Sequence, residues 1–281
     1  MNPDTPDTLR EIIEHKRREV DKAKARTSID ALKDRISELG RPRNFFQAVV
    51  RHQTKTDTAI IAEIKRKSPS AGWIRPEYEG NAFDPVAIAR RYHANGAAAI
   101  SCLTDERFFA GNPAYIHAIR DAVPLPVLRK DFIIDEWQVY ESRALGADAI
   151  LLIAECLNES ELLDLMILAR DLQLTALIEV HDMDNLLRVR HHIGFPMRSY
   201  SLLGINNRDL RTMTTDLAHT LRLVDLVEDP SVLVSESGIS EPEHLERLCT
   251  AGVRIALIGE SFMRTEDPGA ALAKILKRDV K

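Results

Sequence analysis

Residues 145–180 read LGADAILLIAECLNESELLDLMILARDLQLTALIEV, and this stretch decides the fold. An apolar run at 148–153 is followed by an amphipathic, helix-length segment at 159–172 and by a second apolar run at 175–178. Strands that are continuously apolar are buried on both faces, which is typical of parallel strands wrapped by helices. The stretch therefore predicts a strand, a helix and a second strand parallel to the first.

The same unit recurs along the chain. Apolar runs occur at 59–64, 97–103, 126–128, 148–153, 175–178, 201–205, 231–234 and 254–258, with amphipathic segments between them at 84–95, 135–145, 159–172, 183–192, 216–227, 241–250 and 268–277. Eight units without a Pro/Gly/Ser-rich linker predict an α/β fold, a (β/α)8 TIM barrel. A doubly wound sheet is the alternative, but no GxGxxG motif follows a predicted strand.

The first 55 or so residues differ from the rest of the chain. Stretches at 8–26 and 28–39 carry apolar residues at helical spacing among many charges, which predicts two or three amphipathic helices. We therefore expect a single barrel domain over 1–281, with 1–55 as its N-terminal helical extension. The basic stretch at 15–26 contains interleaved acidic residues and indicates a solvated helix face, not an anion-binding arm.

The whole-chain composition excludes several classes of protein. The 38 Lys and Arg residues against 43 Asp and Glu give a net charge of −5, which provides no general attraction to nucleic acid or to an anionic membrane. Cys102, Cys156 and Cys249 are odd in number and lack CxxC spacing, so a reducing compartment, the cytoplasm, is expected. Residues 1–9 contain no signal-peptide core, and no apolar run approaches the roughly 18 residues of a membrane span.

Polar side chains recur at the carboxyl ends of the predicted strands, where the catalytic groups of a barrel gather. They are Glu63, Lys65, Lys130, Glu179, Asn206, Glu236 and Ser237. Glu63 and Lys65 are two residues apart and project from the same side of an extended segment, either as a catalytic pair or as an ion pair that closes the barrel. Lys130 follows an apolar run, so burial can lower its pKa for general-acid work, unless it is a plain surface lysine. Glu179 is its natural partner in proton transfer, and Asn206 is either a positioning residue or a turn residue.

Two glycine-containing loops predict a phosphate site after the last two strands. The first contains Gly238, and the second contains Gly259, Glu260 and Ser261. Barrels often bind phosphate with these loops and with the N-terminus of a short helix. The segment 68–72, which includes Ser68, adds hydroxyl and amide donors or acts as a lid.

The sequence lacks the motifs of several other chemistries. The sequence has no HExxH or EF-hand spacing, and the tandem His191 and His192 in a helical stretch indicate an exposed pair and not metal ligands. Cys102 lies within a predicted strand, where a core residue is more common than a nucleophile. We therefore expect neither a metal nor another cofactor.

Seven motifs together resemble the indole-3-glycerol-phosphate synthase family, in the family's order. They are IAEIK at 61–65 with SPS at 68–70, CLTDE at 102–106 with FFAG at 108–111, LRKDF at 128–132, LIEVH at 177–181, GINNRDL at 204–210, SESGI at 235–239 and LIGESFM at 257–263. The resemblance extends from about residue 8 to the C-terminus. It implies a carboxy-lyase of tryptophan biosynthesis that converts 1-(2-carboxyphenylamino)-1-deoxyribulose 5-phosphate into indole-3-glycerol phosphate, carbon dioxide and water without a cofactor.

The resemblance also implies roles for individual residues. Lys130 is the general acid on the ketone oxygen, and Glu179 manages protons in the dehydration. Glu63 and Asn206 orient these groups, and Lys65 holds anionic groups of the substrate. Further substrate-binding residues are Ser68, Arg208, Glu236 and Ser237.

Two alternatives stay open at this point. The first is another sugar-phosphate barrel such as phosphoribosylanthranilate isomerase, which would use a cysteine and an aspartate as base and acid. The second is a phosphate-binding barrel without catalysis. In each case the expected partner is a phosphorylated small molecule, bound by a monomer or by an assembly with other pathway enzymes.

Overall fold

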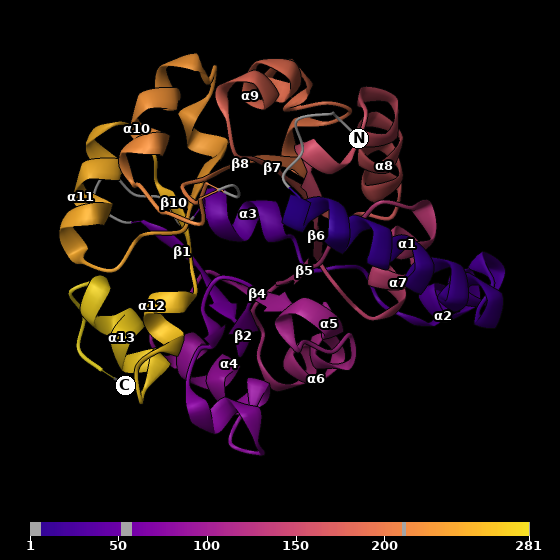
Figure 1. Ribbon diagram of the computed structural model, residues 1–281, viewed down its shortest axis with the longest axis horizontal. Helices are drawn as coiled ribbons and strands as arrows, with labels where there is room; N and C mark the ends of the chain where they lie inside the picture. The colour runs from indigo at the N-terminus through magenta and orange to yellow at the C-terminus, as the bar shows by residue number, and fades with distance from the viewer. Residues whose placement is uncertain (1–6, 52–57, 210–211, 281) are drawn as a thin grey trace.

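The computed structural model describes residues 7–51, 58–209 and 212–280, and a closed barrel of parallel strands lies at its centre (Figure 1). The strands follow one another around the barrel in the order β1-β10-β9-β8-β7-β6-β5-β4. They are β1 (Ala59–Ile64), β4 (Ala99–Leu103), β5 (Val127–Lys130), β6 (Ala149–Ile153), β7 (Thr175–Val180), β8 (Ser201–Asn206), β9 (Leu233–Glu236) and β10 (Ile255–Ile258). The predicted TIM barrel is confirmed.

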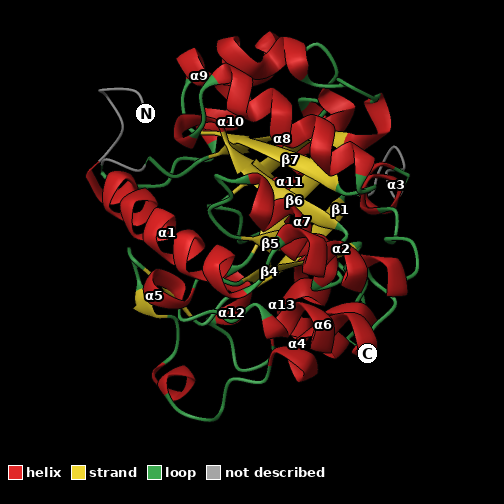
Figure 2. Cartoon of the chain, turned by 90° about the vertical axis from the view of Figure 1, so that its right-hand side faces the viewer, coloured by secondary structure: helices red, strands yellow, loops and turns green. Residues whose placement is uncertain are grey.

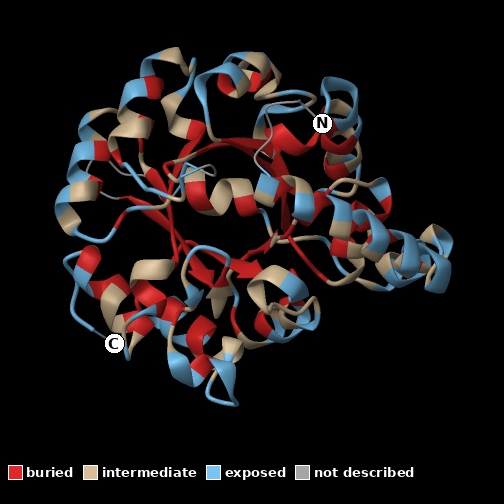
Figure 3. Cartoon of the chain, in the orientation of Figure 1, coloured by how far each residue is buried: buried red, intermediate tan, exposed pale blue. Residues whose placement is uncertain are grey.

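Nearly all strand residues are buried, as their apolar sequences require (Figure 3). The strand predicted at 231–234 begins later, at Leu233, because the 3-10 turn η6 (Pro230–Val232) precedes it. The Asp229 side chain accepts a hydrogen bond from the Ser231 backbone N–H and so stabilises this turn. The shift carries Ser235 and Glu236 into β9, so Glu236 is a strand residue at the mouth of the barrel.

Helices surround the barrel, with their buried faces on the strands and their exposed faces outward (Figure 3). They are α4 (Pro85–Ala94), α6 (Ala114–Ala122), α7 (Glu136–Ala144), α8 (Glu159–Asp171), α9 (Met183–Val189), α10 (Ala218–Leu223), α11 (Pro242–Thr250) and α13 (Pro268–Ile275). All but α6 were predicted. The short α6 buries Ile116 and Ile119, a pair at helical spacing that the sequence analysis did not identify.

Short elements occupy the connections. They are the hairpin of β2 (Lys67–Ser68) and β3 (Gly72–Trp73), the helices α5 (Glu106–Phe109) and α12 (Glu260–Met263), and the 3-10 turns η1 (Pro76–Glu79), η2 (Ala154–Cys156), η3 (Arg190–His192), η4 (Arg198–Tyr200) and η5 (Val224–Leu226). Turns η3 and η5 continue α9 and α10, so the helices predicted at 183–192 and 216–227 tighten in their last turns.

Three helices precede the barrel, in agreement with the predicted extension. They are α1 (Asp7–Arg26), α2 (Ile29–Glu38) and α3 (Phe45–Val50), while residues 1–6 and 52–55 of the predicted extension lie outside the described residues. Figure 2 shows α1 and α3 on opposite sides of the barrel. Among the described helices, including the 20-residue α1, none combines the length and the apolar character that crossing a bilayer requires.

The expectation that 15–26 forms a solvated helix face is wrong for Lys16. Only 2% of the Lys16 side chain is exposed, and its Nζ lies 2.9 Å from Asp105 Oδ2 and 2.9 Å from Asp131 Oδ1. The two carboxylates follow β4 and β5, so the ion pairs join α1 to the barrel mouth. A buried ammonium requires such partners because desolvation is costly.

Candidate active site

All thirteen residues that the sequence analysis proposed for the site line one cavity at the barrel mouth. Its volume is about 440 Å³, and its wall includes Leu9 and Ile12 of α1. The proposed residues are Glu63, Lys65, Ser68, Lys130, Glu179, Asn206, Arg208, Glu236, Ser237, Gly238, Gly259, Glu260 and Ser261. Parallel strands bring these distant segments together, because their carboxyl ends meet at one rim.

Lys130 ends β5 and places its ammonium between two carboxylates. Its Nζ lies 2.6 Å from Glu179 Oε2 and 2.6 Å from Glu236 Oε2. Burial by itself lowers the pKa of Lys130, but the nearby carboxylates, Glu179 first, outweigh burial and hold this pKa above its usual value. The expectation of a lowered pKa is therefore wrong, and Lys130 is charged at neutral pH.

Glu179 and Glu236 share this ammonium unequally. Burial raises the pKa of Glu179, but the charges of Lys130 and His181 outweigh burial and hold it well below its usual value. Burial and the neighbouring Glu179 charge raise the pKa of Glu236 to about 8, more than Lys130 lowers it. The two groups thus titrate as a coupled pair in which Glu179 is the more acidic member.

Glu63 on β1 forms an ion pair with Lys65, since Lys65 Nζ lies 2.6 Å from Glu63 Oε1. The two side chains therefore do lie on the same side of the segment. Gly259 leaves room for this pair, because a Cβ at position 259 would lie 2.8 Å from Glu63 Cβ. A Cβ on Gly204 would collide in the same way with the carboxylate of Glu236. Both glycines thus preserve space for a buried acid.

Asn206 and Arg208 extend the site from β8. Asn206 Nδ2 donates to Glu179 Oε1 at 3.3 Å, and Asn206 Oδ1 accepts from the Arg208 backbone N–H at 3.1 Å. The guanidinium of Arg208 donates to Ser70 Oγ at 2.9 Å and to Glu260 Oε2 at 3.0 Å. Arg208 therefore connects the loop after β1 with the loop after β10.

The loops predicted to bind phosphate meet at the rim of the cavity. Ser237 and Gly238 have positive φ angles of 68° and 75°, and Ser261 Oγ donates to the Ile239 carbonyl at 2.9 Å. The Ser261 hydroxyl thus forms a hydrogen bond that joins the two loops. The Ser261 backbone N–H is the group of this residue that could bind an anion. The Glu260 carboxylate accepts from Arg264 Nη2 at 2.7 Å, so only the Glu260 backbone N–H could serve a phosphate.

The segment 68–72, expected to supply donors or a lid, forms the turn of the β2–β3 hairpin. Ser68 Oγ accepts from the Ala71 backbone N–H at 3.2 Å and lies 3.4 Å from Ser70 Oγ. Ser68, Pro69 and Ser70 line the cavity. The two serines therefore belong to the site, and Ser70 Oγ already accepts a hydrogen bond from the Arg208 guanidinium.

Known proteins match the chain over almost its full length. The family model for indole-3-glycerol phosphate synthase matches residues 9–275. The chain belongs to the indole-3-glycerol phosphate synthase family. The protein of this name from Acidithiobacillus ferrooxidans (strain ATCC 53993 / BNL-5-31) is 47% identical over 266 residues, which cover 95% of this chain and 97% of the relative. The one from Magnetococcus marinus is 44% identical over 274 residues, which cover 98% of this chain and 99% of the relative.

A solved structure supports the fold alone. The 3-hexulose-6-phosphate synthase of Salmonella typhimurium superimposes with a TM-score of 0.59 at 13% identity, and the match covers 78% of this chain and 97% of that chain. Family membership confirms the resemblance found in the sequence. It also confirms the predicted function, that of an indole-3-glycerol phosphate synthase, a carboxy-lyase of tryptophan biosynthesis.

The synthase-family cavity also has an apolar wall that the sequence analysis did not identify. Ile12 of α1, Phe109, Phe132 and Leu151 contribute to it, and the two phenylalanine rings lie 6.1 Å apart. An aromatic substrate ring fits such a wall. The rule that catalytic groups follow strands finds polar residues only, and it cannot find an apolar residue that reaches the mouth from a helix or a loop.

His181 is a polar residue of the cavity that was also missed. It lies two residues after Glu179, and its Nε2 is 3.2 Å from Glu179 Oε1. A signal was present, because alternate residues of an extended segment point to the same side.

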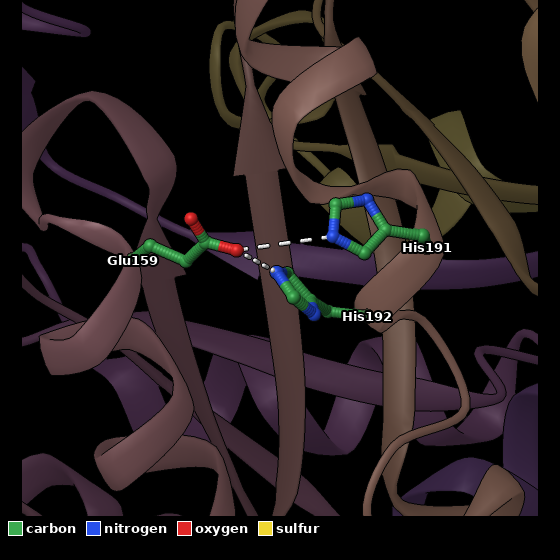
Figure 4. Close-up of side chains that lie close together, drawn as sticks. All are labelled: Glu159, His191 and His192. Atoms are coloured by element: carbon green, nitrogen blue, oxygen red, sulfur yellow. Dashed lines mark hydrogen bonds and ion pairs between the residues drawn. The ribbon is translucent and has the colours of Figure 1, made fainter.

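Glu159, His191 and His192 form a cluster, and none of the three is among the residues that line the cavity (Figure 4). Glu159 Oε1 lies 3.8 Å from His191 Nε2 and 2.9 Å from His192 Nε2. The expectation of an exposed pair holds for His191, with 57% of its side chain exposed, but is wrong for His192, with 13%. Glu159 reaches this pair from α8, a contact between two elements that local spacing does not predict.

The three cysteines are free, and two of them, Cys102 and Cys156, are buried. Burial raises the pKa of the Cys102 thiol, so this side chain is a core residue, as predicted from its position in a strand.

Proposed function

We propose that the cavity binds 1-(2-carboxyphenylamino)-1-deoxyribulose 5-phosphate and that Lys130 is the general acid of ring closure. The ammonium of Lys130, held at the cavity by Glu179 and Glu236, is the observation that carries this proposal. As the ring carbon that bears the carboxylate attacks the ketone carbon, the ketone oxygen gains negative charge and becomes basic. Lys130 is charged at neutral pH, so it can donate its proton to that oxygen and stabilise the charge before transfer.

Decarboxylation and dehydration follow in the same cavity. Loss of carbon dioxide returns the electrons of the broken bond to the ring and restores its aromaticity. Once Lys130 has given up its proton, one of the two charges that lower the pKa of Glu179 is gone, and Glu179 becomes a stronger base. Glu179 then accepts the proton that the ring intermediate loses, and Lys65 donates a proton to the departing hydroxyl group, which leaves as water.

Cationic and polar side chains around this pair support the orientation of the substrate. Lys65, held by Glu63, supplies a second positive charge near the substrate's anionic groups. Arg208, Ser68 and Ser237 line the same cavity and offer further donors for substrate hydroxyl and carboxylate groups. Asn206 orients Glu179 through its amide.

The phosphate of the substrate is assigned to the loops after β9 and β10. Backbone N–H groups of Gly238, Gly259, Glu260 and Ser261 are the proposed donors, at the rim where a TIM barrel often binds phosphate. Anchoring the phosphate reduces the entropy cost of folding the sugar chain back onto the ring. The helix α1 contributes Leu9 and Ile12 to the wall, so we propose one domain over 1–281 in which the extension 1–55 encloses the substrate.

The proposal is tested by supplying the purified protein with this substrate and following indole fluorescence. Phosphoribosylanthranilate, supplied in parallel, tests the isomerase alternative, whose cysteine base has no counterpart among the cavity residues that the structure describes. Product from the first substrate alone supports the synthase. Absence of product with a folded protein would favour the phosphate-binding barrel without catalysis.

Two lysine variants separate the proposed roles. Lys130→Met is expected to lower kcat by about a hundredfold or more, the usual scale for a positioned proton donor. Lys65→Met is expected to raise KM. Lys33→Met on α2, where 53% of the side chain is exposed, is the control and should change neither. Unchanged turnover in a folded Lys130→Met protein would rule out the acid, and an unchanged KM would count against Lys65.

The cytoplasm remains our proposed location, because free cysteines suit a reducing compartment. A phosphorylated small molecule is the implied partner, given the family. We propose that a monomer suffices for activity, because every proposed site residue comes from this chain.

A further inference from the structure

His181 and Glu155 lie directly behind Glu179, and the proposed reaction uses neither. His181 follows β7 by one residue, and Glu155 lies in η2 at the end of the adjacent strand β6. His181 Nε2 lies 3.2 Å from Glu179 Oε1, and its Nδ1 lies 3.3 Å from Glu155 Oε2. The His181 backbone N–H donates to Glu155 Oε1 at 2.8 Å. The imidazole is therefore held between two carboxylates.

This arrangement favours a charged imidazole. Each ring nitrogen of His181 faces a carboxylate oxygen, and a neutral ring carries a hydrogen on only one nitrogen. Only 7% of each of the side chains of His181 and Glu155 is exposed, so water cannot readily take the place of a missing partner. Burial opposes the charge, but Glu155 and then Glu179 outweigh it and raise the pKa of His181 to about 10.

The neighbouring groups complete a row of alternating charges. Glu155, His181, Glu179 and Lys130 are in turn negative, positive, negative and positive, and Glu236 lies beyond Lys130. His219 from α10 also faces His181 and interacts with the His181 backbone. Burial and then Arg222 lower the pKa of His219, so it adds no competing charge.

We propose that His181 is a positioning residue for Glu179 and that Glu155 is the buried counter-charge that keeps His181 protonated. The imidazolium contacts Glu179 Oε1, while Glu179 Oε2 points toward Lys130. His181 therefore sets the orientation of the Glu179 carboxylate. It also keeps Glu179 ionised before each turnover. The inference rests on the proposed function only for its kinetic measurement.

The variant His181→Gln keeps a hydrogen-bond donor and removes the charge. Loss of an opposite charge at this distance is expected to raise the pKa of Glu179 by about one to three units. The acid limb of the kcat profile should therefore move toward neutral pH, with kcat at the acid end lowered about tenfold or more and KM changed less than about twofold. An unchanged pH profile would overturn the proposal.

The variant Glu155→Gln tests the counter-charge. Without Glu155 the pKa of His181 should fall from about 10 toward its ordinary value of about 6.5, so the ring should lose its proton near neutral pH. His181 stays protonated at acid pH in this variant, so the acid limb of kcat should move less than it does in His181→Gln, and an equal displacement would contradict the counter-charge role. The double variant Glu155→Gln/His181→Gln should show the displaced acid limb of His181→Gln. The double variant leaves neither a charged residue 155 nor a charged residue 181 without its partner. It should therefore fold, and it can test the proposal, even if one of the single variants does not fold.

The matched controls are Glu159→Gln and His192→Gln, which disrupt the ion pair of Figure 4. This pair has the same chemistry and lies outside the residues that line the cavity. Both control variants should retain the wild-type pH profile, and a shift as large as that of His181→Gln would overturn a specific role for His181.

Nuclear magnetic resonance of the histidine rings tests the inference without turnover. The His181 signal, assigned by its loss in His181→Gln, should stay that of an imidazolium between pH 6 and about 8.5 in the unmodified protein and titrate in that range in Glu155→Gln. Titration near pH 6.5 in the unmodified protein would overturn the inference. Absence of product with a charged His181 would instead count against the proposed function alone.

Discussion

Replacement of Lys16 by methionine tests whether a buried ion cluster holds the first helix on the barrel. Lys16 Nζ lies 2.9 Å from Asp105 and 2.9 Å from Asp131, and 3.1 Å from the more exposed Glu19. Methionine retains the apolar part of the side chain and removes the ammonium. Asp105 and Asp131 then remain buried without their shared cation.

The expected loss of stability follows from this geometry. Removing one partner of a buried ion pair costs about 3–5 kcal/mol, because the other charge stays desolvated. Asp131 keeps Arg129 at 3.2 Å and the Phe132 backbone N–H at 2.8 Å, so the lower end, about 3 kcal/mol, is expected. Leu9 and Ile12 line the cavity from the same helix, so a rise in KM should accompany the loss.

Thermal and urea denaturation measure the free energy of unfolding. A loss of about 3 kcal/mol corresponds to a fall in Tm of roughly 6–12 °C for a domain of this size. The control is Lys24→Met on the same helix, whose Nζ lies 2.9 Å from Asp135 with 41% of the lysine side chain exposed. This exposed pair should contribute at most about 1 kcal/mol. Equal losses in the two variants would refute the reasoning.

Three further predictions follow from the site and from the buried cluster. Gly259→Ala places a Cβ against Glu63, so we expect a loss of about 1–3 kcal/mol in urea denaturation and a higher KM; unchanged values would show that the segment shifts freely. Burial raises the pKa of Asp131, but the charges of Lys16 and Arg129 and their hydrogen bonds together outweigh burial, so this pKa is lowered on folding. The stability that the Asp131 carboxylate contributes is thus fully present above its unfolded pKa of about 3.9 and is lost as pH falls toward its folded pKa. The urea concentration at the unfolding midpoint should therefore decline below about pH 4. This decline should be less steep in Asp131→Asn. A chelator such as EDTA should leave turnover unchanged, because Lys130 and Lys65 supply positive charge at the cavity; turnover lost with the chelator and restored by a divalent cation would contradict this.

Local pattern was enough to predict which residues form strands and which polar residues reach the barrel mouth. The run 59–64 was predicted as a strand and is β1, and Glu63, Lys130 and Glu179 all line the cavity. Both results depend on neighbours in the sequence, because an apolar run specifies a buried parallel strand and the closed barrel brings all strand ends to one rim. The helix α6 was missed although its buried residues, Ile116 and Ile119, are at helical spacing.

Charge states and long-range contacts were decided only by the tertiary structure. The pKa of Lys130 was expected to fall and is instead raised, because its two carboxylate partners lie 49 and 106 residues away in the chain. Lys16 was expected in solvent, yet it is buried by carboxylates that follow two separate strands. Electrostatic energy depends on distance and solvation in space, and neither quantity is present in a linear pattern until the chain has closed the barrel.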